Sequence, residues 1–240
     1  MNRILFETKE SDYLLSPRDP RFEHVRGVLR MKEGDSFDVG VINGPAGKAT
    51  LERLDKGEMK VSVEWGEIPP PPPPVYLLVG LCRPATARKI LTTVPTLGVR
   101  GLLFARTARS DPAYARSSLW TAGEWRQRLI EGCEQAFDTF LPELSLHEEL
   151  GEAVEQTRQL DCRSFALDVY EGSRALSTVE VTAADPVCLA IGPERGWDAN
   201  DRAILAGGGF KLVSLNQRVL RVENAVTVGL TLVLQRMGIY

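Results

Sequence analysis

Six consecutive prolines, Pro69 to Pro74, divide the chain into two parts with different sequence patterns. Proline fixes its own φ and has no N–H to donate, so this run favours an extended polyproline II spacer of roughly 19 Å. A ligand for a proline-recognition domain is the alternative. Regular patterns resume on both sides, which favours a linker. We therefore expect two domains, residues 1–68 and 75–240, joined by residues 69–74.

Short strand patterns separated by glycines fill the part before the linker. Four segments show them: residues 3–8, 35–42, 48–54 and 59–65. This spacing is typical of a small β-barrel. One helical pattern interrupts it at residues 20–31, with apolar residues recurring on one face: Phe22, Val25, Val28 and Leu29.

Strand and helix patterns alternate after the linker. Apolar runs or strand patterns occur at residues 75–82, 98–106, 164–170, 186–192 and 210–215. Helical patterns occur up to Leu97 and at residues 117–137, 146–160, 199–206 and 221–236. Asp198 is a suitable N-cap for the helix that follows it. The alternation predicts an α/β domain with a mostly parallel sheet.

The composition is that of a soluble globular protein, with 43% hydrophobic and 25% charged residues. The chain begins without a signal-peptide pattern and has no apolar run of membrane-spanning length, so we expect a cytoplasmic protein with no membrane association. Its four cysteines are far apart and in apolar surroundings, which predicts buried free thiols. With only two histidines in addition, we expect no metal site.

Basic residues are concentrated in two segments, although the net charge is −3. Residues 83–110 contain six basic residues and no acidic one: Arg83, Arg88, Lys89, Arg100, Arg106 and Arg109. Residues 18–32 hold five basic residues against Asp19 and Glu23. Such local patches on an acidic chain indicate a defined anionic partner. Arginines that merely coat helix surfaces are the alternative for either patch alone.

Two loops near the C-terminus have the features of a ligand site. IGPERGW (191–197) and SLNQRVLRVENA (214–225) each follow a predicted strand. Ligands of open parallel sheets bind beyond the carboxyl ends of strands, and glycine lets backbone groups approach them closely. Neither the dinucleotide G-x-G-x-x-G pattern nor a P-loop sequence is present. Alone, IGPERGW is more often a tight turn, but the two loops together indicate a pocket.

These two loops resemble the paired C-terminal motifs of the RsmE family. Its members are SPOUT-superfamily methyltransferases that modify N3 of a uridine in 16S ribosomal RNA, with the usual motifs IGPEGG and LGxRILRxETA. Three further segments are similar to family motifs: HVRGVLRMKEGD (24–35), TLGVRGLLFARTARS (96–110) and EWRQRLIEGCEQA (124–136). The resemblance therefore covers nearly the whole chain, in the order that the family has.

The resemblance implies a PUA-like β-barrel domain that binds RNA and a SPOUT-type α/β domain that ends in a trefoil knot. It also implies S-adenosylmethionine as the cofactor, 16S rRNA of the small ribosomal subunit as the partner, and a homodimer. Motif positions assign two sets of residues to the cofactor: Leu189, Ile191, Gly192, Glu194 and Gly196, and Leu215, Asn216, Val219, Leu220 and Arg221. They assign two residues to the RNA-contacting side, and the basic segment adds four candidates for phosphate contact: His24, Arg30, Arg83, Arg88, Lys89 and Arg106.

The chain departs from the family motifs at several positions. Arg195 replaces the second glycine of GPEGG, and Asn216 replaces the glycine of LGxR. After the EQ pair the family usually has a small residue and an arginine, whereas this chain has Phe137, Asp138 and Thr139. If Arg195 adopts a positive φ, its backbone is strained in a way that glycine avoids. Asn216 tolerates that conformation better. These changes could alter the target or weaken the enzyme.

The implied chemistry is attack by uracil N3 on the methyl group of a sulfonium, so N3 must lose its proton. A carboxylate such as Glu194 or Glu223 can assist, and Arg221 or Arg218 can stabilise the uracil anion. For Glu223, a salt bridge at the start of a helix is at least as good an account. Two other functions remain open: a non-catalytic or retargeted RNA-binding member of the family, and an unrelated α/β enzyme that binds another small ligand.

Overall fold

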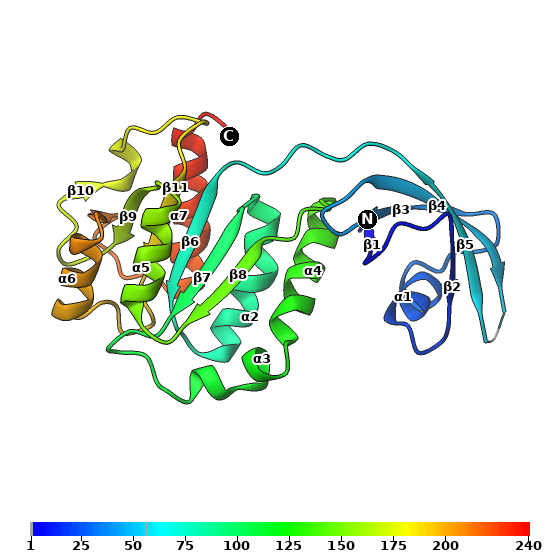
Figure 1. Ribbon diagram of the computed structural model, residues 1–240, viewed down its shortest axis with the longest axis horizontal. Helices are drawn as coiled ribbons and strands as arrows, with labels where there is room; N and C mark the ends of the chain where they lie inside the picture. The colour runs from blue at the N-terminus through cyan, green and yellow to red at the C-terminus, as the bar shows by residue number, and fades with distance from the viewer. Residues whose placement is uncertain (1, 56) are drawn as a thin grey trace. The chain divides into compact units, whose positions relative to one another are not determined.

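The computed structural model describes residues 2–55 and 57–240, which form two compact units (Figure 1). The first unit comprises the chain up to Pro71 together with Cys133–Leu141, and the second comprises Pro72–Gly132 and Pro142–Tyr240. The proline run is thus shared between the units. The carbonyl of Pro72 accepts a hydrogen bond from Arg100 Nη2 at 2.7 Å, and the carbonyl of Pro74 accepts one from the Val187 N–H at 2.9 Å.

The first unit contains a curled sheet, of which the described residues form five strands. These strands are β1 (Ile4–Phe6), β2 (Asp12–Leu15), β3 (Ser36–Val41), β4 (Ala46–Leu54) and β5 (Met59–Trp65), in the order β1-β3-β4-β5-β2. Inward-facing side chains such as Val39, Leu51 and Val61 are fully buried and form the core. The sequence predicted four of these strands but not β2, because four residues are too few to establish an alternating pattern.

The helix expected at residues 20–31 is shorter and wider than predicted. An α-helical turn, α1 (Pro20–Glu23), continues as a π-helical turn at His24–Val28. A π-helical turn contains more residues than an α-helical one, so the 3.6-residue spacing of the apolar face is lost. Phe22 and Val25 are buried as predicted, but the prediction was wrong for Val28, which is 67% exposed.

The second unit is built on a parallel sheet with seven strands among the described residues. They are β6 (Val75–Gly80), β7 (Gly101–Ala105), β8 (Glu143–His147), β9 (Arg163–Leu167), β10 (Arg174–Ala175), β11 (Val187–Ile191) and β12 (Lys211–Ser214). Their order is β10-β12-β9-β11-β6-β7-β8, and each observed pairing is parallel. The predicted α/β class with a parallel sheet is confirmed.

Helices cover both faces of this sheet (Figure 1). They are α2 (Pro84–Thr93), α3 (Ser118–Thr121), α4 (Glu124–Ala136), α5 (Leu150–Gln159), α6 (Ala199–Gly207) and α7 (Val222–Arg236). α2 packs against α7, and α5 packs against α6. Along β11, Leu189 lies beneath α7, whereas Cys188 and Ala190 belong to the core cluster on the α5–α6 face. Because both faces are covered, the strands read as continuous apolar runs.

Two of the helical expectations were wrong. The helix expected over residues 117–137 is broken into α3 and α4 at Gly123, whose φ of +70° takes the backbone out of the helical region. Residues 143–147, partly assigned to a helix from residue 146, form strand β8 instead. By contrast, the expected N-cap is confirmed: Asp198 Oδ1 accepts the Asp201 N–H at 2.7 Å in a capping box.

The four cysteines are free thiols, as predicted. Cys82, Cys133 and Cys188 are buried, whereas Cys162 is half-buried. Over residues 2–55 and 57–240, no helix combines the length and the apolar character needed to cross a membrane.

Candidate functional site

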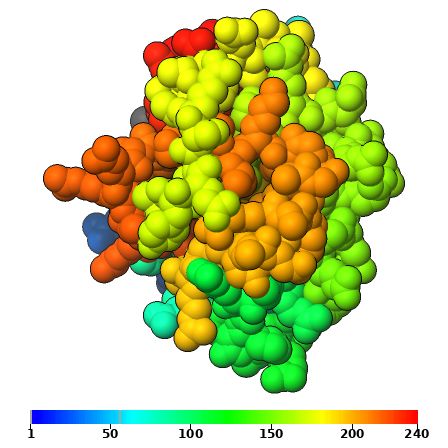
Figure 2. All heavy atoms as spheres, turned by 90° about the vertical axis from the view of Figure 1, so that its left-hand side faces the viewer, coloured from blue at the N-terminus to red at the C-terminus, as the bar shows by residue number. Residues whose placement is uncertain are grey.

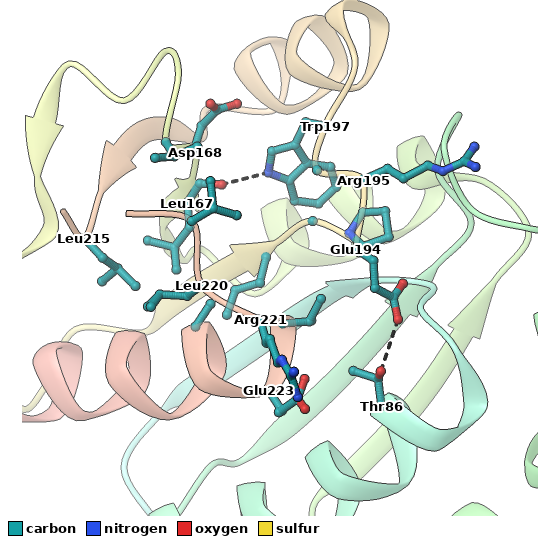
Figure 3. Close-up of a pocket in the computed structure, with 18 of the residues that line it drawn as sticks. Thr86, Leu167, Asp168, Glu194, Arg195, Trp197, Leu215, Leu220, Arg221 and Glu223 are labelled. Atoms are coloured by element: carbon teal, nitrogen blue, oxygen red, sulfur yellow. Dashed lines mark hydrogen bonds between the residues drawn. The ribbon is translucent and has the colours of Figure 1, made fainter. Parts of the chain in front are cut away.

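A cavity of about 720 Å³ opens at the carboxyl ends of β9, β11 and β12 (Figures 2 and 3). The loop after β11 and the loop after β12 both line it, so the structure brings the two predicted loops together. In Figure 2, residues 215–221 (orange) protrude at the left of this face, beside the segment after β9 (yellow-green). The volume lies within the range of about 300–1,000 Å³ that is usual for small-molecule pockets.

A third loop, which the sequence did not single out, completes the cavity. β9 lies between β11 and β12 in the sheet, so the two predicted loops do not follow adjacent strands. The residues at the end of β9 and just after it also line the cavity: Leu167, Asp168, Val169 and Tyr170. The available signal was the aspartate directly after the apolar run 164–167, at a carboxyl strand end, where ligands of parallel sheets bind.

The loop after β11 is a tight turn closed by glycine. Gly196 has a φ of +65°, and its N–H donates to the Pro193 carbonyl at 2.8 Å. Arg195 and Asn216 have no positive φ, so the strain considered for Arg195 does not occur. The exposed Arg195 side chain runs away from Leu215 and Leu220 (Figure 3), and its carbonyl accepts a hydrogen bond from Arg109 Nη1 at 2.6 Å.

Glu194 fastens this loop to the start of α2. Its Oε1 accepts hydrogen bonds from the Arg83 N–H and the Thr86 hydroxyl, each at 3.1 Å (Figure 3). Arg83 is the N-cap residue of α2 and offers no capping side chain itself, so the carboxylate from the other loop takes that place. Negative charge at a helix N-terminus is stabilising. Within the described chain, Oε2 has no hydrogen-bond partner.

Buried polar contacts fix the floor of the cavity and the loop after β9. The indole of Trp197 is 1% exposed and donates through Nε1 to the Leu167 carbonyl at 3.0 Å. The buried Asp168 carboxylate accepts the N–H groups of Tyr170 and Glu171 and, at 2.6 Å, Nε of Arg202. Burial raises the pKa of Asp168, but these donors outweigh it and hold the pKa below its usual value.

The loop after β12 presents two arginines at the cavity. Arg218 and Arg221 line it and are exposed. In the described part of the chain the Arg218 guanidinium has no partner, and that of Arg221 forms no hydrogen bond but interacts electrostatically with Glu223. Glu223 forms an ion pair with Lys89 at 3.0 Å. A backbone N–H and this ion pair hold the pKa of Glu223 below its usual value. The salt bridge considered for Glu223 is therefore present.

Nine of the ten residues assigned to the cofactor line the cavity: Ile191, Gly192, Glu194, Gly196, Leu215, Asn216, Val219, Leu220 and Arg221. The exception is Leu189, which does not line it because its side chain is buried beneath α7. The structure thus gathers nearly the whole assigned set around one space.

The candidate RNA contacts are more dispersed. Arg83 and Lys89 line the cavity. Arg88 donates to both carboxylate oxygens of Glu124 at 2.8 Å. The hydrogen bonds from Arg88 and Arg128 lower the pKa of Glu124 to about 2. The remaining candidates do not line the cavity. Arg106 Nε donates a hydrogen bond to the Glu148 carbonyl. His24 and Arg30 belong to the first unit, where His24 is half-buried and Arg30 is exposed with a φ of +53°.

Comparison with known proteins places this fold and its pocket in a class. Residues 69–234 match the family of the RNA methyltransferase domain, and residues 17–64 match the family of the RNA methyltransferase PUA domain. The fold resembles a ribosomal RNA small subunit methyltransferase E from Neisseria gonorrhoeae bound to S-adenosyl methionine, with a TM-score of 0.82 at 18% identity over 98% of this chain and 97% of that one. Together, these matches define an RNA methyltransferase.

Proteins of similar sequence identify the family of RNA methyltransferases to which the chain belongs. The chain is 32% identical to ribosomal RNA small subunit methyltransferase E of Treponema pallidum, over 98% of this chain and 91% of that protein. It is 24% identical to ribosomal RNA small subunit methyltransferase E 1 of Borreliella burgdorferi, over 94% of each. The chain belongs to the ribosomal RNA small subunit methyltransferase E family, which confirms the resemblance stated from the motifs.

Proposed function

We propose that this protein transfers a methyl group from S-adenosylmethionine to N3 of a uridine in the 16S rRNA of the small ribosomal subunit, in the cytoplasm. The observation that carries the proposal is the convergence of both family motif loops on one cavity. Relatives named ribosomal RNA small subunit methyltransferase E support the substrate, and the S-adenosyl methionine bound to the Neisseria gonorrhoeae protein supports the cofactor.

The residues of the cavity fit S-adenosylmethionine. Its interior is apolar at Leu167, Ile191, Leu215 and Leu220, which suits a flat adenine ring. In the described chain, the backbone N–H groups of Val219 and Leu220 have no hydrogen-bond partner, so main-chain recognition of adenine is available. When bound, this cofactor supplies a methyl group that its sulfonium already activates.

The protein must position the uridine and stabilise the charge that develops during methyl transfer. We assign Arg221 and Arg218 to the developing negative charge on uracil, because both are exposed at the cavity and, in the described chain, no hydrogen bond holds either guanidinium group. Glu194 has one unpartnered oxygen, Oε2, with which it can accept the N3 proton. Glu223 is less suited to that role because Lys89 already neutralises it.

The two domains have different proposed roles. We propose that residues 1–68 form the PUA-like RNA-binding domain, with His24 and Arg30 on its RNA-contacting side. Residues 69–74 link it to the methyltransferase domain, residues 75–240, whose C-terminal part forms the trefoil knot of the family. Arg83 and Arg106 are the stronger candidates for phosphate contacts, because Arg88 and Lys89 would have to leave Glu124 and Glu223 to bind RNA.

We further propose that the enzyme is a homodimer that associates through α7. One face of this helix is exposed and carries no charge: Asn224, Thr227, Val228, Thr231 and Gln235. Charged residues are depleted in the cores of stable interfaces, and an uncharged helix face fits that composition. Light scattering should give twice the chain mass of 26.5 kDa, whereas a monomer would exclude the dimer.

A pair of glycine variants tests the cofactor site. Gly196→Ala and Gly209→Ala both place a side chain at a positive φ with no heavy atom within 4 Å, but only Gly196 lines the cavity. Both variants should therefore lose a similar amount of stability. Calorimetry should show S-adenosylmethionine binding at least about tenfold weaker in Gly196→Ala alone, since a shift of the loop misplaces its backbone contacts. Equal affinities in the two variants would place the cofactor elsewhere.

The non-catalytic alternative rests on the departures at Arg195, Asn216 and Asp138. The first two involve no positive φ, so the structure gives no backbone strain that would disable the cofactor loops. Methyl transfer to small subunits that lack the modification separates the alternatives. Turnover supports the enzyme, whereas cofactor binding without turnover supports an RNA-binding descendant.

A further inference from the structure

The mouth of the cavity carries an aromatic side chain that the proposed chemistry does not use. Tyr170 lines the cavity and is 80% exposed. Among the described residues its phenol has no hydrogen-bond partner. No hydrogen bond or ring contact among the described residues therefore holds this aromatic ring in place.

The backbone that presents Tyr170 is held in position from below. Asp168 Oδ1 accepts the Tyr170 N–H at 2.8 Å and the Glu171 N–H at 3.0 Å. Asp168 Oδ2 is bound by Arg202 Nε at 2.6 Å, and the Asp168 side chain is 2% exposed. A buried, multiply bonded carboxylate fixes the turn, so the ring is presented with little loss of backbone freedom on binding.

Several exposed arginines line the same cavity. Arg195, Arg218 and Arg221 line the cavity and are exposed. Within the described residues the side chains of Arg195 and Arg218 have no partner, whereas Arg221 interacts electrostatically with Glu223. Arg195 lies across Trp197 from Asp168 in Figure 3. Arg109 anchors the Arg195 carbonyl, which leaves the guanidinium free to reach outward. Three exposed guanidinium groups at one cavity of a chain with net charge −3, two of them without a side-chain partner in the described residues, indicate a polyanionic ligand.

An enzyme that reacts with a base must take that base out of its stack. Proteins hold unstacked RNA bases on aromatic rings and bind the backbone through arginine. We propose that Tyr170 stacks on an unstacked base of the target RNA strand, at or beside the uridine, and that Arg195 binds a neighbouring phosphate. This inference rests on the proposed function and extends it to how the cavity mouth binds the nucleotide. Arg195 would then be an added phosphate contact where the usual family motif has glycine.

Equilibrium binding of purified small ribosomal subunits to the full-length protein tests the proposal without depending on turnover. Tyr170→Ala should weaken binding by about tenfold, the usual worth of one stacked base, and Tyr170→Phe should restore it because the ring is kept. Arg195→Ala should reduce the slope of log affinity against log salt by about one, and Arg195→Lys should keep the slope.

Matched controls lie away from the cavity. Tyr240, 61% exposed, and Arg158, paired with Glu155, can be changed to alanine, and neither change should affect subunit binding. Calorimetry with S-adenosylmethionine should give the wild-type affinity for Tyr170→Ala and Arg195→Ala. Light scattering should give the wild-type mass for both.

Three results would overturn the inference. Subunit binding unchanged in Tyr170→Ala would remove the stacking role, and a parallel loss of S-adenosylmethionine affinity would make Tyr170 a cofactor residue. A change in mass would make it an interface residue. Failure of the proposed function would look different, because the wild-type protein would then transfer no methyl group. The binding of the variants to the small subunit could still be compared with that of the wild type in that case.

Discussion

Gly80, the last residue of β6, lies directly beneath the loop after β11. A Cβ at this position would lie 2.5 Å from Pro193 Cδ and 2.8 Å from Pro193 N. Ordinary van der Waals contact begins at 3.4 Å, so these two distances are about 0.9 and 0.6 Å too short. Because the proline ring is part of the backbone, it cannot rotate away, and the loop itself must shift in Gly80→Ala.

The size of the effect follows from that displacement. Forcing an extra methyl group into a packed site costs about 1–3 kcal/mol, so the free energy of unfolding from urea titrations should fall by about 2 kcal/mol. A misplacement approaching 1 Å can cost about 100-fold in rate. We therefore expect kcat for methyl transfer to fall at least about tenfold, although Gly80 is not among the residues that line the cavity.

Gly151→Ala is the matched control. Gly151 lies in α5, its φ is not positive, and a Cβ there would meet no heavy atom within 4 Å. Alanine should stabilise this helix by up to about 1 kcal/mol and leave kcat unchanged. If Gly80→Ala kept both wild-type stability and wild-type kcat, the tight packing of β6 beneath Pro193 would not support the loop in the way that we argue.

Three further predictions concern ionisable groups. Asp168→Asn should lower the free energy of unfolding at pH 7 by about 2 kcal/mol, because it weakens the buried pair with Arg202. Folding lowers the pKa of Asp168, so its contribution to stability is fully present above the unfolded pKa of about 3.9 and is lost as the pH falls through the folded pKa. The free energy of unfolding should therefore depend less on acidic pH in the variant than in the wild type. The NMR titration of the Glu124 carboxyl should have its midpoint near the pKa of about 2 that its two arginine partners impose, and a midpoint near 4.3 would exclude these ion pairs. Burial raises the pKa of Cys133 and Cys162 to about 12, so a thiolate reagent at pH 8 should label them slowly in the folded protein and rapidly after unfolding; fast labelling of the native protein would refute their burial.

Local patterns in the sequence were sufficient for the fold class and the central strands of the second unit. Continuous apolar runs identified the central strands, since only a sheet covered on both faces buries every residue of a strand. β10 is two residues long, too short to carry a pattern. β8, ELSLH, does alternate apolar and polar residues, but it lies close to the helical pattern of α5 and was merged with it.

The site was predicted to the extent that its residues are contiguous in sequence. Both motif loops line the cavity, but the order of strands in the sheet is a long-range property, so the loop after β9 with Asp168 and Tyr170 was missed. Glu194 was assigned to chemistry, whereas the structure shows that one of its oxygens caps α2 across 111 residues of sequence. Such a contact has no local signal.

Nucleoside analysis of 16S rRNA tests the central claim most directly. Small ribosomal subunits that lack the modification are incubated with the purified protein and isotopically labelled S-adenosylmethionine, and the rRNA is then digested and examined by mass spectrometry. We predict labelled N3-methyluridine, formed at least about tenfold more slowly by the Gly80→Ala variant. No labelled nucleoside, or a label on another base or on a ribose, would contradict it.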